Sequence, residues 1–274
     1  MPKSARLSAG AAVCAALFLA AAGCGGDGPP AAGGGAKGPD GGLSGRIFVY
    51  CAAGVKEPVS ALAESFKKET GVEVELTFAN SGQLLGQAEM TRTGDVYIPG
   101  DTGFIDQART KGLVAGEPRD FCWFVPTILV QKGNPKGIKG LGDLSAPGMR
   151  LALADDTAAI GKLQTRVFAK NALDVAAIKK NVVASPATVT DTALTVKMKT
   201  ADAAIVWDST AAMFAGDAGI VRIPVEKNVI GIVASAVLAS SRNRPAAEAF
   251  ADYLASARGR EVLRARGFTV EAPK

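Results

Sequence analysis

The sequence predicts an α/β fold in which strands alternate with helices. Short apolar runs typical of buried strands are followed repeatedly by segments whose apolar residues recur at helical spacing. Glycine, proline and asparagine stand at the junctions, where turns are expected. In a chain of 274 residues, of which 48% are hydrophobic, this rhythm indicates one large or two small domains built on a mostly parallel sheet.

The first half of the body supplies three strand–helix units. Residues 46–51 form a buried apolar run, and Pro58 stands at the start of a helical pattern that Gly71 ends. Asn80-Ser81-Gly82 opens the second helix. The predicted strands are residues 46–51, 72–78 and 95–99, and the predicted helices are residues 58–70, 80–92 and 102–111.

The second half repeats this rhythm with longer connections. Residues 121–131 are a candidate for one long strand, and a loop-rich connection follows over residues 135–148. Another strand over residues 229–239 precedes closing helices over residues 245–266. The other predicted strands are residues 150–154, 203–207 and 220–225, and the other predicted helices are residues 160–172, residues 189–199 and a short one after Asp208.

The composition excludes several classes of function. The chain has no histidine, which removes the usual proton shuttle near neutral pH, the commonest metal ligand, and all Ser-His-Asp or Cys-His enzymes. A formal charge of +5 without any Lys/Arg block is too small and too dispersed for a nucleic-acid binder. We therefore expect no nucleic-acid partner, no cofactor and no free metal cation.

Two short motifs resemble enzyme signatures but are incomplete. Ser65 and Lys68 match the Ser-x-x-Lys pattern of penicillin-binding enzymes, whose other two elements are missing, and both fall on the polar face of a helix. Gly161-Lys162 lacks the first glycine and the hydroxyl residue of a phosphate-binding P-loop. Because no enzyme motif is complete, we expect a protein that is not an enzyme.

The N-terminus has the pattern of an export signal. Lys3 and Arg6 precede an apolar stretch over residues 9–22 that is too short to span a bilayer comfortably. The small residues directly before Cys24 resemble the lipobox of bacterial lipoproteins, in which the peptide is cut before the cysteine and the cysteine carries lipid. Ordinary secretion with cleavage near the same place is the alternative. We predict a signal peptide over residues 1–23, with the lipid on Cys24 as the only membrane attachment.

A tether separates this signal from the folded body. Residues 24–45 contain ten glycines and three prolines and almost nothing apolar to bury, so we expect a flexible segment and a body that begins near Arg46. The body contains Cys51 and Cys122, each in an apolar, strand-like run. Outside the cytoplasm these two cysteines could pair, but two buried thiols are the interpretation we favour.

Small and hydroxyl residues recur where predicted strands run into helices. A helix start carries unpaired backbone N–H groups and a partial positive charge, so it can bind an anion without a cationic side chain. Each of these residues alone is typical of an ordinary helix cap, and only the convergence of several in one cleft would make a site. The four places are Ala52-Ala53-Gly54, Asn80-Ser81-Gly82, Ala158-Ala159-Ile160-Gly161 and Ala187-Thr188-Val189.

An ordered series of segments resembles the molybdate-binding proteins of ABC importers. It opens with IFVYCAAGV at residues 47–55 and continues with FKKETGV at residues 66–72, TFANSGQL at residues 77–84 and GDVYIPGD at residues 94–101. The later segments are residues 130–135, 140–144, 204–207, 250–254 and 267–268. The resemblance covers residues 46–270, which is essentially the whole body.

This resemblance implies a two-lobed type II periplasmic binding protein fold with two crossover strands at the hinge. Lobe one would comprise residues 46–125 and 233–274, and lobe two residues 126–232. The implied function is to capture molybdate or tungstate in the cleft between the lobes and to deliver it to the permease of an ABC importer. The protein would be a monomer, anchored by lipid on the periplasmic or outer face of a bacterial membrane.

Carried over by position, the resemblance also implies the ligand contacts. Gly54 stands where the family has a serine, so backbone N–H groups at Ala53 or Gly54 would serve without a hydroxyl. Trp207 stands where the family has a tyrosine and would donate one hydrogen bond from a larger ring. The six implied ligand-binding residues are Ala53, Gly54, Ser81, Ile160, Val189 and Trp207.

A site of this kind would select its anion by size and by protonation. Every group donates and none accepts, so the proton of a hydrogen phosphate would find no acceptor, whereas only pocket size would exclude sulfate. Asp208 or Asp156 could instead approach the metal centre of the oxyanion, as carboxylates do in some archaeal relatives. For Asp208 a helix cap is the interpretation we favour.

Three other functions are alternatives. The first is a protein of the same fold that binds sulfate, phosphate or another anion; a ferric-ion site is disfavoured because Tyr50, Tyr97 and Tyr253 lie far apart in the helix–strand order. The second is a lipid-anchored enzyme, and the third is a sensor or partner-binding lipoprotein with an empty cleft.

Overall fold

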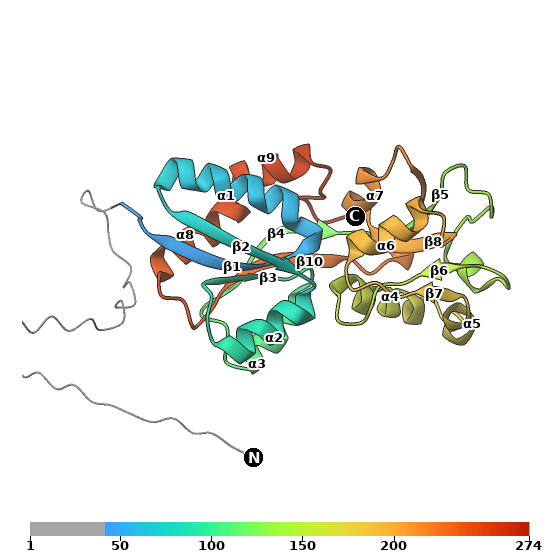
Figure 1. The fold of residues 1–274 in the computed structure, drawn as a ribbon, viewed down its shortest axis with the longest axis horizontal. Helices are drawn as coiled ribbons and strands as arrows, with labels where there is room; N and C mark the ends of the chain where they lie inside the picture. The colour runs from blue at the N-terminus through green and yellow to red at the C-terminus, as the bar shows by residue number, and fades with distance from the viewer. Residues whose placement is uncertain (1–41, 274) are drawn as a thin grey trace, which may run out of the picture. The chain divides into compact units, whose positions relative to one another are not determined.

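The computed structural model describes residues 42–273, all of which belong to one compact unit (Figure 1). The predicted signal peptide, Cys24 and most of the predicted tether lie outside the described residues. Among the described helices, none combines the length and the hydrophobicity that crossing a membrane requires.

The first of two five-stranded sheets has the strand order β2-β1-β3-β10-β4. Figure 1 shows α1 and α9 on one side of this sheet and α2 and α3 on the other. The strands are β1 (Arg46–Ala52), β2 (Glu73–Ala79), β3 (Val96–Ile98), β4 (Arg119–Phe124) and β10 (Gly231–Val237). The helices are η1 (Ala53–Val55), α1 (Lys56–Thr70), α2 (Ser81–Thr91), α3 (Thr102–Thr110), α8 (Arg244–Ala255) and α9 (Ala257–Ala265). We call this sheet with its helices lobe one.

The second sheet has the order β7-β6-β8-β5-β9, and we call it with its helices lobe two. Its strands are β5 (Pro126–Gln131), β6 (Leu151–Ala152), β7 (Val182–Ala184), β8 (Ala203–Trp207) and β9 (Ala218–Arg222). Its helices are η2 (Leu141–Ser145), α4 (Ala159–Lys170), α5 (Val175–Lys180), α6 (Val189–Lys197), α7 (Asp208–Met213) and η3 (Val225–Lys227). The chain crosses between the sheets twice, from β4 to β5 through Val125 and from β9 back to β10.

Two expectations about the strands were wrong. Neither sheet is mostly parallel, because each has two parallel pairings, β2-β1-β3 in one and β7-β6-β8 in the other, and two antiparallel pairings. The apolar run over residues 121–131 is two strands: β4 pairs with β10 in the first sheet, and β5 pairs with β8 and β9 in the second. Burial makes both strands apolar, so the change of sheet leaves no trace in hydrophobicity.

The two cysteines of the body are free and buried, as the favoured interpretation expected. Cys51 lies in β1 and Cys122 in β4, and both are fully buried. Burial raises the pKa of both thiols, and for Cys122 the nearby Asp208 raises the pKa further. Both side chains therefore behave as small apolar groups in the core.

A buried carboxylate ties the beginning of lobe one to its end. Asp95, which is only 8% exposed, precedes β3 and accepts the backbone N–H of Phe48 at 2.7 Å. Its other oxygen accepts the hydroxyl of Ser241 at 2.7 Å and the backbone N–H of Arg242 at 3.0 Å. Asp95 thus joins β1 to the segment that leads from β10 into α8.

Replacing this carboxylate should destabilise the protein. Asp95→Ala leaves the buried donors of β1 and of the segment after β10 without an acceptor, so we expect the free energy of unfolding to fall by about 3 kcal/mol in a urea titration. The control is Asp120→Ala on the exposed side of β4, which should change stability by less than about 0.5 kcal/mol. Equal losses for the two variants would contradict the role of Asp95.

Candidate functional site

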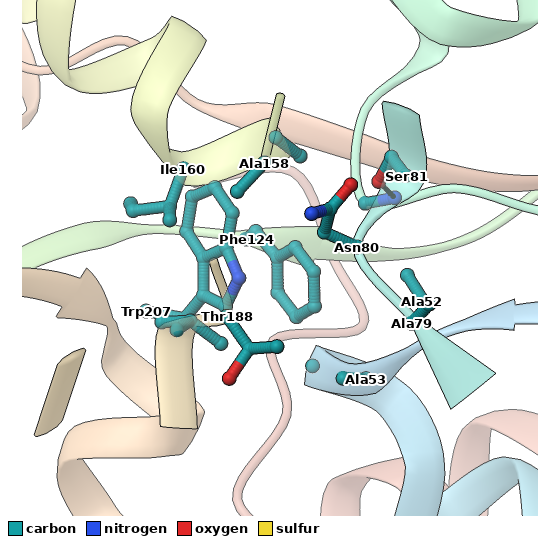
Figure 2. A pocket seen from close by; sticks show the side chains of 14 residues that line it. Ala52, Ala53, Ala79, Asn80, Ser81, Phe124, Ala158, Ile160, Thr188 and Trp207 are labelled. Atoms are coloured by element: carbon teal, nitrogen blue, oxygen red, sulfur yellow. Dashed lines mark hydrogen bonds between the residues drawn. The ribbon is translucent and has the colours of Figure 1, made fainter. Parts of the chain in front are cut away.

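A small pocket lies where ends of strands and starts of helices from both lobes meet (Figure 2). Its cavity volume of about 30 Å³ is large enough for about two water molecules. Lobe one contributes Ala52, Ala53, Gly54, Ala79, Asn80, Ser81, Gly100 and Phe124. Lobe two contributes Ala158, Ala159, Ile160, Thr188, Val189 and Trp207.

The six ligand-binding residues that the resemblance implies all line this one pocket. Ala53 and Gly54 follow β1 in η1, and Ser81 begins α2. Ile160 and Val189 lie in the first turns of α4 and α6, and Trp207 is the last residue of β8. The two lobes therefore bring together residues that are up to 154 positions apart in the sequence, from Ala53 to Trp207. Phe124 and Gly100 also line the pocket, and sequence reasoning missed both.

The starts of three helices meet at the pocket. The first N–H groups of a helix have no partner within that helix and carry the positive end of its dipole. Three helices begin here, α2 at Ser81, α4 at Ala159 and α6 at Val189. The residues at these starts are small or point their bulk into the core, so a ligand can come close to the backbone.

The pocket presents little that can accept a hydrogen bond. None of the residues that line it carries a charged side chain. The side-chain oxygen of Asn80 accepts the N–H of Gln83 at 2.8 Å and so caps α2. The hydroxyl of Thr188 accepts the N–H of Asp191 at 3.1 Å and donates to the Asp191 carboxylate at 2.6 Å. These two polar side chains are occupied by their own helices.

The hydroxyl of Ser81 is oriented as a donor. Its oxygen accepts the backbone N–H of Gly100 at 3.0 Å, and Ser81 is only 2% exposed. The phenol of Tyr97, whose pKa burial raises, donates to the backbone oxygen of Ser81 at 2.8 Å. With the oxygen engaged and the backbone held, the hydroxyl proton of Ser81 is free to point into the pocket.

The indole of Trp207 forms part of the pocket floor. It is 2% exposed and stacks on Phe124, with ring centroids 4.4 Å apart and planes inclined by 11° (Figure 2). Trp207 lines the pocket, and no hydrogen bond of its indole N–H is found among residues 42–273. This N–H is therefore available to a ligand.

Neither candidate carboxylate lines the pocket. Asp208 accepts the N–H of Ser209 and the hydroxyl of Thr269, both at 2.8 Å, and so lies at the crossing between the lobes. Burial raises the pKa of Asp208, and its hydrogen-bond donors oppose that rise. Asp156 is exposed and lines a separate cavity in lobe two. The helix-cap interpretation is wrong about the position, because Trp207 is the N-cap residue and Asp208 is the first residue of α7; its carboxylate nevertheless accepts an N–H of the first turn.

Direct contacts join the two lobes beside the pocket. The backbone N–H of Gly82 donates to the backbone oxygen of Thr157 at 2.9 Å, and the amide of Asn80 donates to the Thr157 hydroxyl at 3.1 Å. The ammonium of Lys162 in α4 lies 3.9 Å from the centre of the Phe104 ring in α3. These contacts close the lobes over the pocket.

The described residues hold no group of three or more His, Cys, Asp or Glu side chains that could bind a metal ion. The side chains that line the pocket itself are all uncharged.

Comparisons with known proteins agree on one family. The family described as bacterial extracellular solute-binding protein matches residues 47–269. The chain is 31% identical over 259 residues to the molybdate-binding protein ModA of Mycobacterium tuberculosis, which covers 93% of this chain and 95% of that protein. It is 26% identical over 236 residues to the ModA protein of Escherichia coli, with 83% and 90% covered.

Solved structures establish the fold. The periplasmic molybdate-binding protein of Azotobacter vinelandii superposes with a TM-score of 0.69 at 18% identity, covering 83% of this chain and 100% of that one. The sulfate-binding protein SubI of M. tuberculosis superposes with a TM-score of 0.73 at 18% identity, covering 83% and 88%. These matches confirm the predicted two-lobed type II periplasmic binding protein fold, and at such identities they carry no information about the ligand.

The contact between Gly82 and Thr157 leads to a prediction about stability. A Cβ atom at position 82 would lie 2.8 Å from the backbone oxygen of Thr157, so Gly82→Ala forces α2 and the loop before α4 apart. We expect the free energy of unfolding to fall by about 1–3 kcal/mol, as for other overpacked sites, measured by urea denaturation.

The matched control for this variant is Gly86→Ala in the same helix. No atom lies within 4 Å of a Cβ at position 86, so this change should raise stability by about 0.5–1 kcal/mol through helix propensity. If Gly82→Ala were also neutral or stabilising, the close contact between the lobes would not exist in solution.

Proposed function

Because the chain belongs to the family of bacterial extracellular solute-binding proteins, we propose that its solute is molybdate or tungstate, which it delivers to the permease of an ABC importer. The pocket between the lobes is the proposed binding site. The observation that carries the proposal is the convergence of helix starts, the Ser81 hydroxyl and the Trp207 indole on a pocket without charged side chains. The ModA relative at 31% identity supports molybdate among the oxyanions.

In the proposed complex each of the implied residues donates a hydrogen bond to an oxyanion oxygen. Ala53 and Gly54 donate from the backbone after β1, and Ile160 and Val189 donate from the starts of α4 and α6. Ser81 donates its hydroxyl proton and Trp207 its indole N–H. A dianion held by neutral donors keeps its charge, and the positive ends of the helix dipoles stabilise that charge.

The same donors would discriminate between oxyanions. A hydrogen phosphate carries a proton that needs an acceptor, and the oxygens of Asn80 and Thr188 are already engaged. Leaving that proton unpaired in a buried pocket costs about 1–3 kcal/mol, so phosphate should bind weakly. Sulfate carries no proton, and only size separates it from molybdate. The small cavity of about 30 Å³ makes sulfate the second candidate solute.

Export and anchoring complete the proposal. The family is extracellular, which supports a signal peptide over residues 1–23, a lipid on Cys24 and a tether over residues 24–45. The body would act as a monomer on the periplasmic or outer face of the membrane. The membership of each strand in one of two sheets supports lobe boundaries at residues 46–125 with 233–274, and at residues 126–232.

A thermal-unfolding titration of the purified protein tests the proposed solute. Molybdate, tungstate, sulfate and phosphate are added separately, and a ligand at a hundred times its dissociation constant should stabilise the fold by about 2.7 kcal/mol. We expect stabilisation by molybdate and tungstate and none by phosphate. Stabilisation by sulfate alone would make sulfate the solute, and no shift with any of these anions would overturn the proposed function.

Removal of the Ser81 hydroxyl tests the geometry of the site. Ser81→Ala loses one donor to a charged ligand, so calorimetry should show molybdate affinity about 10–100-fold lower. The control is Ser235→Ala: Ser235 is also fully buried, but its hydroxyl has no partner within residues 42–273 and does not line the pocket. This control should bind like the unmodified protein. Equal affinity of all three proteins would remove Ser81 from the site.

A further inference from the structure

We propose that Gly54, Phe124 and Trp207 act as one specificity-determining unit, which sets the largest oxyanion that the pocket accepts. The inference rests on the proposed function and adds to it a size limit and a residue, Phe124, that belongs to the hinge. In this unit position 54 has no side chain, which leaves room for the Trp207 indole. The indole N–H, from the opposite lobe, is then the hydrogen-bond donor on this side of the pocket.

The aromatic pair joins the two lobes under the pocket. Phe124 ends β4 in lobe one and Trp207 ends β8 in lobe two, and their rings stack in nearly parallel planes. Both side chains are almost completely buried, at 0% and 2% exposure. Figure 2 shows the two rings side by side between the helix start at Ile160 and the backbone at Ala53. The stack is therefore the floor on which a bound anion would rest.

The absence of a side chain at position 54 leaves room for the indole. A Cβ atom there would lie 3.1 Å from Cζ of Phe124, 3.2 Å from Nε1 of Trp207 and 3.3 Å from Cδ1 of Trp207. Carbon atoms attract one another best at about 3.5–4.0 Å, so all these contacts would be too short. Gly54 is not among the residues with positive φ, so its backbone conformation would accept any residue. Space around the rings is what requires glycine.

The phenyl ring of Phe124 also packs beside a second glycine, Gly100. A Cβ atom at Gly100 would lie 3.3 Å from Cε2 of Phe124, and 2.9 Å from the Cβ of Ala159 across the pocket. The ring thus fits between two glycine positions, Gly54 and Gly100, and under the Trp207 indole. Because interiors are closely packed, a larger anion has to displace these stacked rings, which costs packing contacts.

The same packing places the nitrogen of the indole beside position 54. Nε1 lies next to position 54, where a side chain of that residue would otherwise reach into the pocket. The donor therefore comes from lobe two, although it serves the lobe-one side of the pocket. A ligand that accepts this hydrogen bond draws the two lobes together at their hinge.

A double-mutant cycle tests the coupling of positions 54 and 207. Gly54→Ala, Trp207→Leu and the double variant are compared by thermal unfolding without ligand. We expect Gly54→Ala to lower the unfolding temperature more when Trp207 is present than in the Trp207→Leu background, where the two contacts with the indole are gone and only the contact of the Cβ atom with Phe124 remains. Gly86→Ala, where a Cβ meets nothing within 4 Å, should show no such dependence. Equal effects of Gly54→Ala in both backgrounds would overturn the coupling.

Calorimetric titrations of the same proteins test the size limit. Gly54→Ala should lower molybdate affinity about tenfold more than sulfate affinity, because molybdate is the larger anion, whereas Trp207→Leu should shift the ratio in the opposite direction. Trp207→Phe keeps a ring on Phe124 but removes the N–H, so both affinities should fall about tenfold. An unchanged ratio in the first two variants would overturn the size limit.

The two proposals fail in distinguishable ways. If the unmodified protein bound none of the oxyanions, the proposed function and the size limit would both be overturned. The unfolding cycle needs no ligand, so its result would still decide whether Gly54 is the space that the Trp207 indole requires.

Discussion

Backbone N–H groups at the starts of α2, α4 and α6 lack partners within their own helices, and the fold brings them to one pocket. Most features of the site follow from this arrangement. Helix starts come together only if strands of both sheets end on the same side, so the site needs two lobes. Small residues must stand at those strand ends, because a bulky side chain would cover the backbone donors. Asn80 and Thr188 engage the starts of their own helices: they accept the N–H groups of Gln83 and Asp191, so the donors left for a ligand are those nearer the helix ends.

Much of this architecture could be predicted from the sequence because local patterns of residues determine where helices and strands begin and end. The spacing of apolar residues and the caps at Asn80 and Gly71 placed the elements of lobe one within a few residues. Strand direction carries no such signal: β4, β5, β9 and β10 are as apolar as parallel strands, so the antiparallel half of each sheet was not foreseen. The six-residue α5 and the three-residue β7 are too short for a period to be visible.

For the pocket too, residues with a local sequence signal could be predicted, whereas residues that depend on contacts between distant segments could not. Ser81 and Val189 carry local signals, since each follows a polar residue that caps a helix. Phe124 carries none, because it lies inside an unbroken apolar run and lines the pocket only through the change of sheet at Val125. The sequence shows separately that Gly54 replaces a serine and that Trp207 replaces a tyrosine of the resembling family. The contact that a Cβ atom at position 54 would make with the Trp207 ring could be recognised only in the folded structure, because the two residues belong to different lobes.

The free thiols of Cys51 and Cys122 have a consequence for how the protein matures. Both are sealed in the core of lobe one, and burial raises the pKa of each, so the reactive thiolate is scarce and out of reach of oxidants. Residues 42–273 therefore gain nothing from disulfide-forming catalysts and lose nothing in a reducing compartment. Once the body is folded, an oxidising and a reducing compartment are therefore equivalent for these two buried side chains.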